Sequence, residues 1–574
     1  MSVIIDKNVP AKMHDGTLLR ADIFRPAEDG QYPVLVQRTP YNKEFWPFTY
    51  GALDPIKAAA AGYVVAIQDV RSRWTSDGDT FFMNRDEFED GRDTVEWASE
   101  LPYSNGNVGL YGISYMGGAT WQAAAAGPDA LKAIAPTTAP NDFFINHLWR
   151  GGALLWGTLV SWALAGIGPA ALIRSKLGTE EFLPLLFQLI EDVDDYDKWV
   201  RHMPITSFPP ARLDDSSFLP FFAEILKHPT HDSFNKELLK PARIKVPAQI
   251  IAGWHDLLLA PDLEHFVQTR SEGLTEEARE NTRIIIGPWT HGAFLNVVGE
   301  VDFGFRSNGF FLDMKEDLTG LHIRWFDRWL KGIKNGIDEE ARVKLFVQGI
   351  NRWRDEDDWP LARAVSTPWF LHAGGGLGPE APSTDEAPDS YVYDPQDPCP
   401  TRGGTVLLPG TYPRGPVDQA PILGRRDILV YTSDPLEADL EVTGPVSAVL
   451  YASTSAPDTD WMVKLCDVHP DGRTFNVCDG VLRASYRKSM ESRTLVEPGA
   501  VEKYAVDLWA TSMVFKAGHR LRVVVTSSDF PRYDRNPNTG ELGIEATITK
   551  PALQTIFHDA QRASHLILPI VNNA

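Results

Sequence analysis

The stretch LYGISYMG, residues 110–117, decides the fold. The apolar residues 108–111 predict a short β-strand, which runs through a glycine and a serine into a Gly- and Ala-rich segment with the character of a helix. A tight turn of this kind, from strand to helix, lifts the serine hydroxyl clear of the sheet. A serine hydroxyl is a poor nucleophile alone, so Ser114 matters only if a base and an orienting acid lie elsewhere in the chain.

The segments around Ser114 alternate between strand and helix patterns. Apolar runs predict strands at Pro33–Gln37, Tyr63–Gln68, Ala133–Pro136, Ala248–Gly253, Arg283–Ile286 and Val343–Val347. Helical character appears at Arg85–Glu100 and Gly117–Ala126. Strands spaced by helices, with continuous apolar runs, are typical of a parallel α/β sheet that is buried on both faces.

Two parts of the chain differ from this pattern. Residues 141–240 lose the strand signals and show helical periods at Phe182–Ile190 and Phe218–Leu226, which predicts an inserted helical cap over the active site. After about residue 360, short β-rich runs recur between turn residues: Ile428–Tyr431, Val446–Tyr451, Met462–Cys466, Tyr504–Leu508, Leu521–Val525 and Leu566–Ile570. We therefore expect an α/β body (1–140 and 241–354), a helical cap (141–240) and an all-β jelly-roll sandwich (355–574).

Composition limits the classes of function. The 574 residues are 43% hydrophobic and carry a formal charge of -22, which argues against nucleic acid or an anionic membrane as a partner. Three cysteines and no signal-peptide pattern at the N-terminus predict a reducing, cytoplasmic location. No stretch reaches the roughly 18 apolar residues of a spanning helix; the nearest, Gly151–Leu172, is interrupted by Gly, Ser, Thr and Pro.

An acid and a base come directly after two of the later predicted strands. Asp256 ends the stretch IIAGWHD (250–256), and His291 ends IIIGPWTH (284–291). Residues beyond the carboxyl ends of parallel strands gather in one crevice, so Ser114, Asp256 and His291 are expected to meet. The order Ser, Asp, His is that of α/β-hydrolases. We expect His291 to take the serine proton and Asp256 to fix the histidine tautomer.

Other interpretations of these residues exist. A lone Gly-x-Ser-x-x-Gly is a weak signal, Met116 occupies the usual place of the second glycine, and an isolated buried serine is the simpler alternative. Asp262 and Asp69 are rivals for the acid. We expect His255 to be a packing or surface histidine. His228 and His231 lie three residues apart around Pro229 without a nearby third ligand, so zinc is not expected.

The chain resembles the cocaine esterase-like hydrolases, which are related to X-Pro dipeptidyl-peptidases and α-amino acid ester hydrolases. The resemblance runs essentially end to end. It rests on MHDGTLLRADIFRP (13–26), RTPY (38–41), the 112–117 turn, GWHD (253–256), GPWTH (287–291) and FPRYDRN (530–536). It implies an α/β-hydrolase body, a helical cap and a C-terminal jelly roll, and a glycine at the third place after the serine is this family's version of the turn.

The resemblance also implies site residues. Tyr41 and the backbone N–H of Tyr115 would form the oxyanion hole. The acyl pocket would contain Trp149, Trp162, Leu258, Leu407 and Leu408, although the two tryptophans can also be interpreted as core residues of the cap. Leu258 and Leu408 stand where the family pattern has phenylalanines. Ser72 replaces a usual glycine, which we expect to alter only a local turn.

These observations predict a serine carboxylesterase for uncharged aryl or short to medium acyl esters. The amino acid ester hydrolases carry an acidic pair two and three residues after the catalytic aspartate, where this chain has Leu258 and Leu259. The alternative is an aminopeptidase or amide acylase of the same fold; a non-catalytic sugar-binding protein is the other rival. We expect a small-molecule ester as the partner, no metal or other cofactor, no nucleic acid and no membrane, with a homodimer left open.

Overall fold

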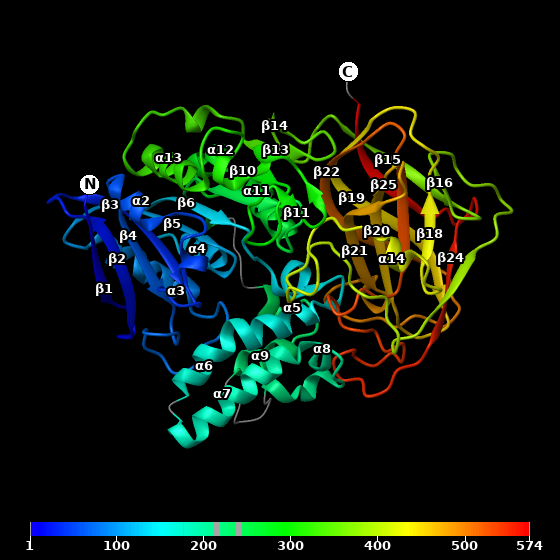
Figure 1. Ribbon diagram of the computed structural model, residues 1–574, viewed down its shortest axis with the longest axis horizontal. Coiled ribbons are helices and arrows are strands. Elements are labelled where there is room, and N and C mark those ends of the chain that lie inside the picture. Colours follow the sequence, from blue (N-terminus) through cyan, green and yellow to red (C-terminus); the bar gives the residue numbers. More distant parts are fainter. Residues whose placement is uncertain (1, 176, 212–218, 237–242, 573–574) are drawn as a thin grey trace.

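The structure is a computed structural model that describes residues 2–175, 177–211, 219–236 and 243–572. Figure 1 shows an α/β part on one side, an all-β part on the other, and a group of helices below them. The all-β part comes last in the chain, and the strand β25 (His565–Val571) lies within it (Figure 1).

A ten-stranded sheet forms the centre of the α/β part. Its strands, in spatial order, are β1 (Val3–Lys12), β2 (Leu18–Pro26), β4 (Val64–Asp69), β3 (Tyr32–Thr39), β5 (Ser104–Ile113), β6 (Leu131–Thr137), β9 (Gln249–Gly253), β10 (Arg283–Gly287), β13 (Val343–Val347) and β14 (Arg352–Glu356). The run from β4 to β13 is parallel, and the strands at each end are antiparallel. The carboxyl ends of β5, β9 and β10 therefore lie at the same edge.

Helices cover both faces of this sheet. Alternate residues of the strands belong to two separate apolar cores, as the period of two in a strand requires. One core includes α3 (Glu87–Ser99), α4 (Tyr115–Ala125) and α11 (Leu259–Glu272); the other includes α2 (Pro55–Ala60) and α13 (Leu318–Leu330). Burial on both faces explains why these strands are continuous apolar runs in the sequence.

The segment between β6 and β9 is mainly helical. It contains η1 (Phe143–His147), α5 (Trp156–Ser161), η2 (Trp162–Ile167), α6 (Gly168–Arg174), α7 (Thr179–Asp194), α8 (Tyr196–Trp199), α9 (Pro220–Lys227) and α10 (Ser233–Lys236). A small hairpin, β7 (Trp149–Arg150) and β8 (Ala153–Leu154), precedes α5. The sequence did not predict this hairpin, because two-residue strands are too short to give a periodic pattern.

One helical stretch in this segment has the length and composition of a membrane span. Trp156–Arg174 is continuous and has a mean hydropathy of 1.4, although the sequence led us to expect no such stretch. However, 61% of this stretch is buried within the protein, and the core helix of a soluble protein can have the same length and apolar composition. Its buried side chains, including Trp156 and Leu164, pack into the apolar core shared with α7 and α9.

The C-terminal part is an all-β domain built on an eleven-stranded sheet. Its strands are β15 (Ala364–His372), β16 (Gly376–Gly378), β17 (Asp389–Tyr393), β18 (Leu429–Thr432), β19 (Leu440–Thr454), β20 (Asp460–Val468), β21 (Thr474–Arg483), β22 (Glu502–Phe515), β23 (Arg520–Thr526), β24 (Ala552–Phe557) and β25 (His565–Val571). They enclose their own apolar core, which includes Trp461 and Tyr504.

The β7–β8 hairpin joins the helical segment to the all-β domain. The backbone N–H of Arg483 donates to the carbonyl of Gly151 at 2.7 Å, and the carboxylate of Asp534 accepts from the N–H of Leu154 at 2.7 Å. The same carboxylate is paired with the Arg483 guanidinium at 2.9 Å. The hairpin turn therefore lies directly against β21.

Gly151 leaves no room for a side chain at this contact. Its φ is +53°, and a Cβ there would lie 2.0 Å from the carbonyl oxygen of Val481. We expect Gly151→Ala to lower the free energy of unfolding by roughly 2–5 kcal/mol, because left-handed strain and a backbone clash add together. Gly336→Ala is the control: its φ is +80° but its surroundings are open, so about 1 kcal/mol is expected. Equal urea midpoints for the two variants would contradict the close contact.

Candidate active site

Ser114 lies in the turn between β5 and α4. Its backbone has φ 62° and ψ -126°, a strained conformation for a residue with a side chain. The turn is tight because the helix approaches the strand closely: a Cβ on Gly112 would lie 2.6 Å from the backbone of Met116, and one on Gly117 would lie 2.9 Å from Ala139 Cβ. These contacts explain why positions 112 and 117 are glycines. Position 116, where the commoner motif has its second glycine, accommodates a methionine.

His291 connects Ser114 to Asp256. Its Nε2 lies 2.8 Å from the Ser114 Oγ, and its Nδ1 lies 3.0 Å from both carboxylate oxygens of Asp256. Asp256 is fully buried, and one of its oxygens also accepts the backbone N–H of Leu258 at 2.7 Å. The three residues predicted from strand ends thus lie in one hydrogen-bonded chain, in the order acid, base, serine.

Two backbone bonds fix the loops that carry the acid and the base. The N–H of Trp254 donates to the carbonyl of Gly287 at 2.8 Å, and the N–H of His255 donates to that of Trp289 at 3.0 Å. The loops after β9 and β10 are therefore held together by main-chain hydrogen bonds, in addition to the bond between the side chains of Asp256 and His291. This explains how two residues 35 positions apart reach hydrogen-bond distance.

The rival acids have other partners. Asp262 accepts the backbone N–H of Ala139 at 2.9 Å, and its burial raises its pKa well above the usual value. Asp69 accepts the backbone N–H of Lys43 at 2.8 Å and the Thr75 hydroxyl at 2.8 Å. The two ring nitrogens of His291 bond instead to Ser114 and Asp256, so Asp256 is the acid of this arrangement.

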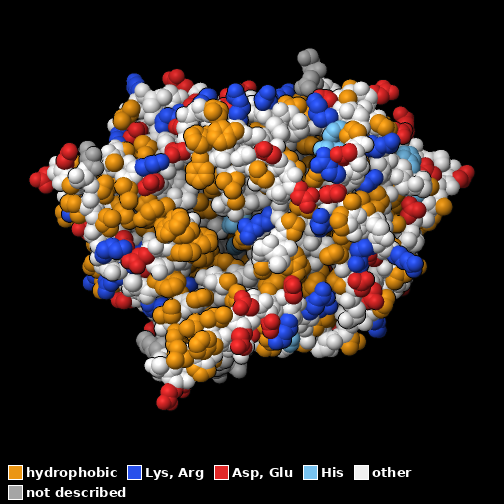
Figure 2. Space-filling model, viewed as in Figure 1, with side chains coloured by type: hydrophobic (Ala, Val, Ile, Leu, Met, Phe, Trp, Pro, Cys, Tyr) orange, Lys and Arg blue, Asp and Glu red, His pale blue; other side chains and the backbone are white. Residues whose placement is uncertain are grey.

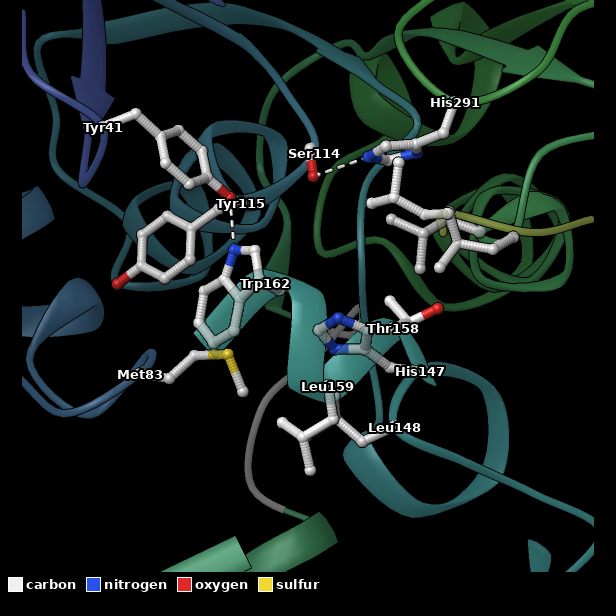
Figure 3. Close-up of a pocket in the computed structure, with 13 residues that line it drawn as sticks. Tyr41, Met83, Ser114, Tyr115, His147, Leu148, Thr158, Leu159, Trp162 and His291 are labelled. Carbon is white, nitrogen blue, oxygen red and sulfur yellow. Dashed lines mark hydrogen bonds between the residues drawn. The ribbon is translucent and has the colours of Figure 1, made fainter. Parts of the chain in front are cut away.

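Tyr41 lies beside Ser114, and its hydroxyl accepts the indole N–H of Trp162 at 2.9 Å (Figure 3). Burial raises the pKa of Tyr41 to about 12, while the bond from Trp162, the Arg73 charge and the nearby Ser114 hydroxyl lower it to a smaller extent. The phenol is therefore protonated at neutral pH. Because Trp162 already donates to the oxygen, the phenolic proton is left to point elsewhere, and Ser114 lies on that side.

Tyr115 contributes its backbone rather than its ring. Its hydroxyl donates to Glu87 at 2.6 Å, so the ring points away from Ser114 (Figure 3). Its backbone N–H belongs to the first turn of α4, where amide groups have no intrahelical partner and the helix dipole favours negative charge. An oxyanion hole formed by Tyr41 and this N–H remains the expectation that the resemblance gives.

A cavity of about 40 Å³ opens beside Ser114. It is lined by Tyr41, Met83, Ser114, Tyr115, His147, Leu148, Thr158, Leu159, Trp162, Leu257, Leu258, His291 and Leu407. The α/β part, the helical segment and the all-β domain all contribute to this wall. None of the described lining residues is Asp, Glu, Lys or Arg, so the cavity is suited to uncharged groups.

The cavity contains three of the five expected pocket residues. Trp162, Leu258 and Leu407 line it, but Trp149 and Leu408 do not. Trp149 is 2% exposed and stacks on Phe144, with ring centroids 5.5 Å apart, because it begins the β7–β8 hairpin and points into the apolar core. Leu408 lines a neighbouring cleft of about 530 Å³ that shares Trp162 and Leu407 with the cavity. Figure 2 shows this face of the molecule hollowed near its centre.

Sequence reasoning missed the polar lining residues His147 and Thr158. They come from short helical elements, η1 and α5, in a segment whose sequence shows only a general helical character. Thr158 stands within the apolar run 153–160, whereas His147 follows the polar residue Asn146 and gives no such signal. A family pattern at these positions would have been needed to distinguish them from surface residues.

The other histidines considered from the sequence, His255, His228 and His231, have partners outside the cavity. His255 is buried and pairs with Gln348 at 2.8 Å, and its burial lowers its pKa to about 4. His228 pairs with Asp232, and His231 with Asp142, each at 2.6 Å. Among the described residues, the group spaced to hold a metal ion is Asp467, His469 and His519, in the all-β domain and outside the cavity.

This arrangement can perform acyl transfer. A serine bonded to a histidine that is itself bonded to a buried carboxylate can attack a carbonyl carbon while the histidine takes the proton. Tyr41 and the N–H of Tyr115 can donate to the oxygen that becomes negative. None of these steps uses a metal ion.

Comparison with known proteins finds relatives in the same family that the sequence resembles. The family model of X-Pro dipeptidyl-peptidases (S15 family) matches residues 15–293, and that of the X-Pro dipeptidyl-peptidase C-terminal non-catalytic domain matches residues 335–567. Cocaine esterase from Rhodococcus sp. (strain MB1 Bresler) is 36% identical over 99% of this chain and 98% of its own length.

Two solved structures share the fold over nearly the whole chain. An aminopeptidase from a marine sediment archaeon, Thaumarchaeota archaeon, has a TM-score of 0.84 and 26% identity, covering 100% of this chain and 96% of its own. An α-amino acid ester hydrolase has a TM-score of 0.82 and 24% identity, covering 99% and 96%. The all-β domain is therefore part of the shared architecture.

The bond between Trp162 and Tyr41 gives a test of the oxyanion-hole role that the resemblance implies for Tyr41. We expect Tyr41→Phe to lower kcat for p-nitrophenyl acetate by roughly 10²–10³, the usual effect of losing one such donor. Trp162→Phe keeps an aromatic ring but removes the N–H, and we expect kcat to fall about 5- to 10-fold. In the Tyr41→Phe background the second substitution should have little effect, because the hydroxyl that it orients is gone.

Trp156→Phe is the matched control, since its indole donates to the carbonyl of Val200 at 2.8 Å within the same segment. It should lower stability and leave kcat near the wild-type value. If Trp162→Phe lowered kcat equally in both backgrounds, Trp162 would act on the substrate and not through Tyr41.

Proposed function

The chain belongs to the cocaine esterase-like hydrolases of the X-Pro dipeptidyl-peptidase (S15) family, and we propose that it is a serine carboxylesterase for uncharged esters. The observation that carries this proposal is the hydrogen-bonded chain from Asp256 through His291 to Ser114. Ser114 and His291 face a cavity whose described lining residues include no Asp, Glu, Lys or Arg. The proposed acyl groups are aromatic or short to medium aliphatic.

The reaction can be derived from the geometry. Ser114 Oγ attacks the ester carbonyl and passes its proton to His291 Nε2, while Asp256 stabilises the imidazolium through Nδ1. Tyr41 and the N–H of Tyr115 hold the oxyanion. His291 then gives the proton to the departing alcohol, which leaves an acyl group on Ser114. A water molecule, deprotonated by His291, then attacks the acyl carbon. The bond from that carbon to Ser114 Oγ breaks and His291 returns the proton to Oγ, which releases the acid and restores the serine.

The other parts of the chain shape the substrate site in this proposal. The helical segment acts as a cap, since its residues Trp162, Thr158 and Leu159 line the cavity. The all-β domain, which we propose to be a jelly roll, adds Leu407 to the wall. The larger cleft that shares Trp162 and Leu407 gives the alcohol part of the ester a place to lie.

The alternative is an aminopeptidase or an α-amino acid ester hydrolase. Two structural neighbours carry these names, which supports the alternative at the level of the family. Against it, Leu258 and Leu259 are buried apolar residues at the positions where the amino acid ester hydrolases have an acidic pair. A substrate ammonium would lose its hydration there and gain no counterion, at a cost of a few kcal/mol.

The nucleophile is tested by Ser114→Ala. We expect the variant to fold normally and to lose on the order of 10⁶ in turnover. The wild-type enzyme should also be labelled covalently by a fluorophosphonate, and the variant should not. A folded variant that kept more than about a tenth of the activity would contradict the role of Ser114.

The substrate class is tested by a matched panel. We expect kcat/KM for p-nitrophenyl benzoate and butyrate to exceed that for phenylglycine methyl ester and an X-Pro anilide, because burial of an apolar acyl group contributes roughly 1.5–3 kcal/mol. The esters should be compared at equal enzyme concentration and after correction for spontaneous hydrolysis. If an amino-acyl or X-Pro substrate were preferred, the alternative function would replace this one.

A further inference from the structure

Thr158 has an unusual position for a threonine in a helix. It lies in α5, is 7% exposed and lines the Ser114 cavity. Its hydroxyl has no hydrogen-bond partner among the residues that the structure describes. A helical threonine can donate to a carbonyl three or four residues earlier, as Thr120 in α4 does to Met116 at 2.9 Å. The Thr158 hydroxyl is therefore available to a bound molecule.

His147 adds a second polar group to the same wall. Figure 3 places His147 and Thr158 near each other, on the side of the cavity opposite Ser114. Burial lowers the pKa of His147 to about 3, with a smaller contribution from the charge of His291. The ring is thus neutral at neutral pH, and a neutral imidazole has one donor and one acceptor nitrogen.

The rest of the cavity determines whether the substrate group that contacts Thr158 and His147 should be charged, neutral and polar, or apolar. Its other described lining residues are mostly apolar, including Leu148, Leu159 and Leu257. A charged group would lie there without a counterion, whereas a neutral oxygen could bond to Thr158 at little cost. A purely apolar acyl chain would leave the buried hydroxyl unpaired, which is unfavourable.

We propose that the preferred acyl group carries a neutral hydroxyl or keto oxygen away from the ester carbonyl, and that Thr158 is the specificity-determining residue that bonds to it. This inference rests on the proposed esterase function and narrows its substrate class. The ester carbonyl lies at Ser114, and the polar end of the acyl group reaches across the cavity to Thr158 and His147.

The test compares matched pairs of p-nitrophenyl esters: butyrate with 3-hydroxybutyrate, and hexanoate with 6-hydroxyhexanoate. The measured quantity is the ratio of kcat/KM for the hydroxylated ester to that for its unsubstituted partner. We expect a ratio of roughly 5–10 or more for at least one pair in the wild-type enzyme. Thr158→Val, which replaces the hydroxyl with a methyl group of similar size, should bring that ratio close to the ratio of the spontaneous hydrolysis rates.

Two further variants complete the test. Thr158→Ser keeps the hydroxyl and should keep the preference. Thr120→Val removes a buried threonine hydroxyl outside the cavity and should leave the ratio unchanged. A wild-type ratio near that of spontaneous hydrolysis for both pairs, or a preference that survives in Thr158→Val, would overturn the inference while the esterase function stands. An enzyme that cleaved none of these esters would instead overturn the proposed function, and the inference with it.

Discussion

The close approach of α4 to β5 is the constraint on which the site depends. Gly112 and Gly117 let the helix come within van der Waals contact of the strand and of Ala139, so the turn between them has to be short. The short turn forces Ser114 into a left-handed backbone conformation and places its hydroxyl above the sheet edge. The strain is local, and the fully buried surroundings of α4 hold it in place.

The other functional groups are positioned by the same sheet edge. Parallel pairing brings the ends of β9 and β10 beside each other, and backbone bonds between their loops fix the distance between Asp256 and His291. Tyr41 and Tyr115, the residues proposed to form the oxyanion hole, follow the ends of β3 and β5. The substrate walls, in contrast, come from outside the sheet, through Trp162 of the helical segment and Leu407 of the all-β domain. The reacting side chains are therefore positioned by the rigid sheet, whereas the walls of the cavity are built largely by the helical segment and the all-β domain that pack against it.

This division explains which features could be predicted from the sequence. The α/β strands are visible as apolar runs, and the serine, acid and base each come directly after one of these runs, because parallel strands end at a common edge. The pocket was harder to predict. Trp149 and Trp162 look equivalent in sequence, yet the turn at Gly151 directs the first into the core and η2 directs the second to the cavity. Edge strands such as β1, with mixed polar residues, also lack a clear signal.

The position of Leu407 in the wall has a consequence for the synthesis of the enzyme. Ser114, Asp256 and His291 all lie within about the first half of the 574-residue chain, but Leu407, which lines the cavity, lies more than a hundred positions later. The contacts of Arg483 and Asp534 with the β7–β8 hairpin come later still. Since domains generally fold as units from the N-terminus during synthesis, a nascent chain would hold the reactive groups before it holds a finished binding site. We therefore expect selective hydrolysis only from a chain whose last domain has folded against the other two parts.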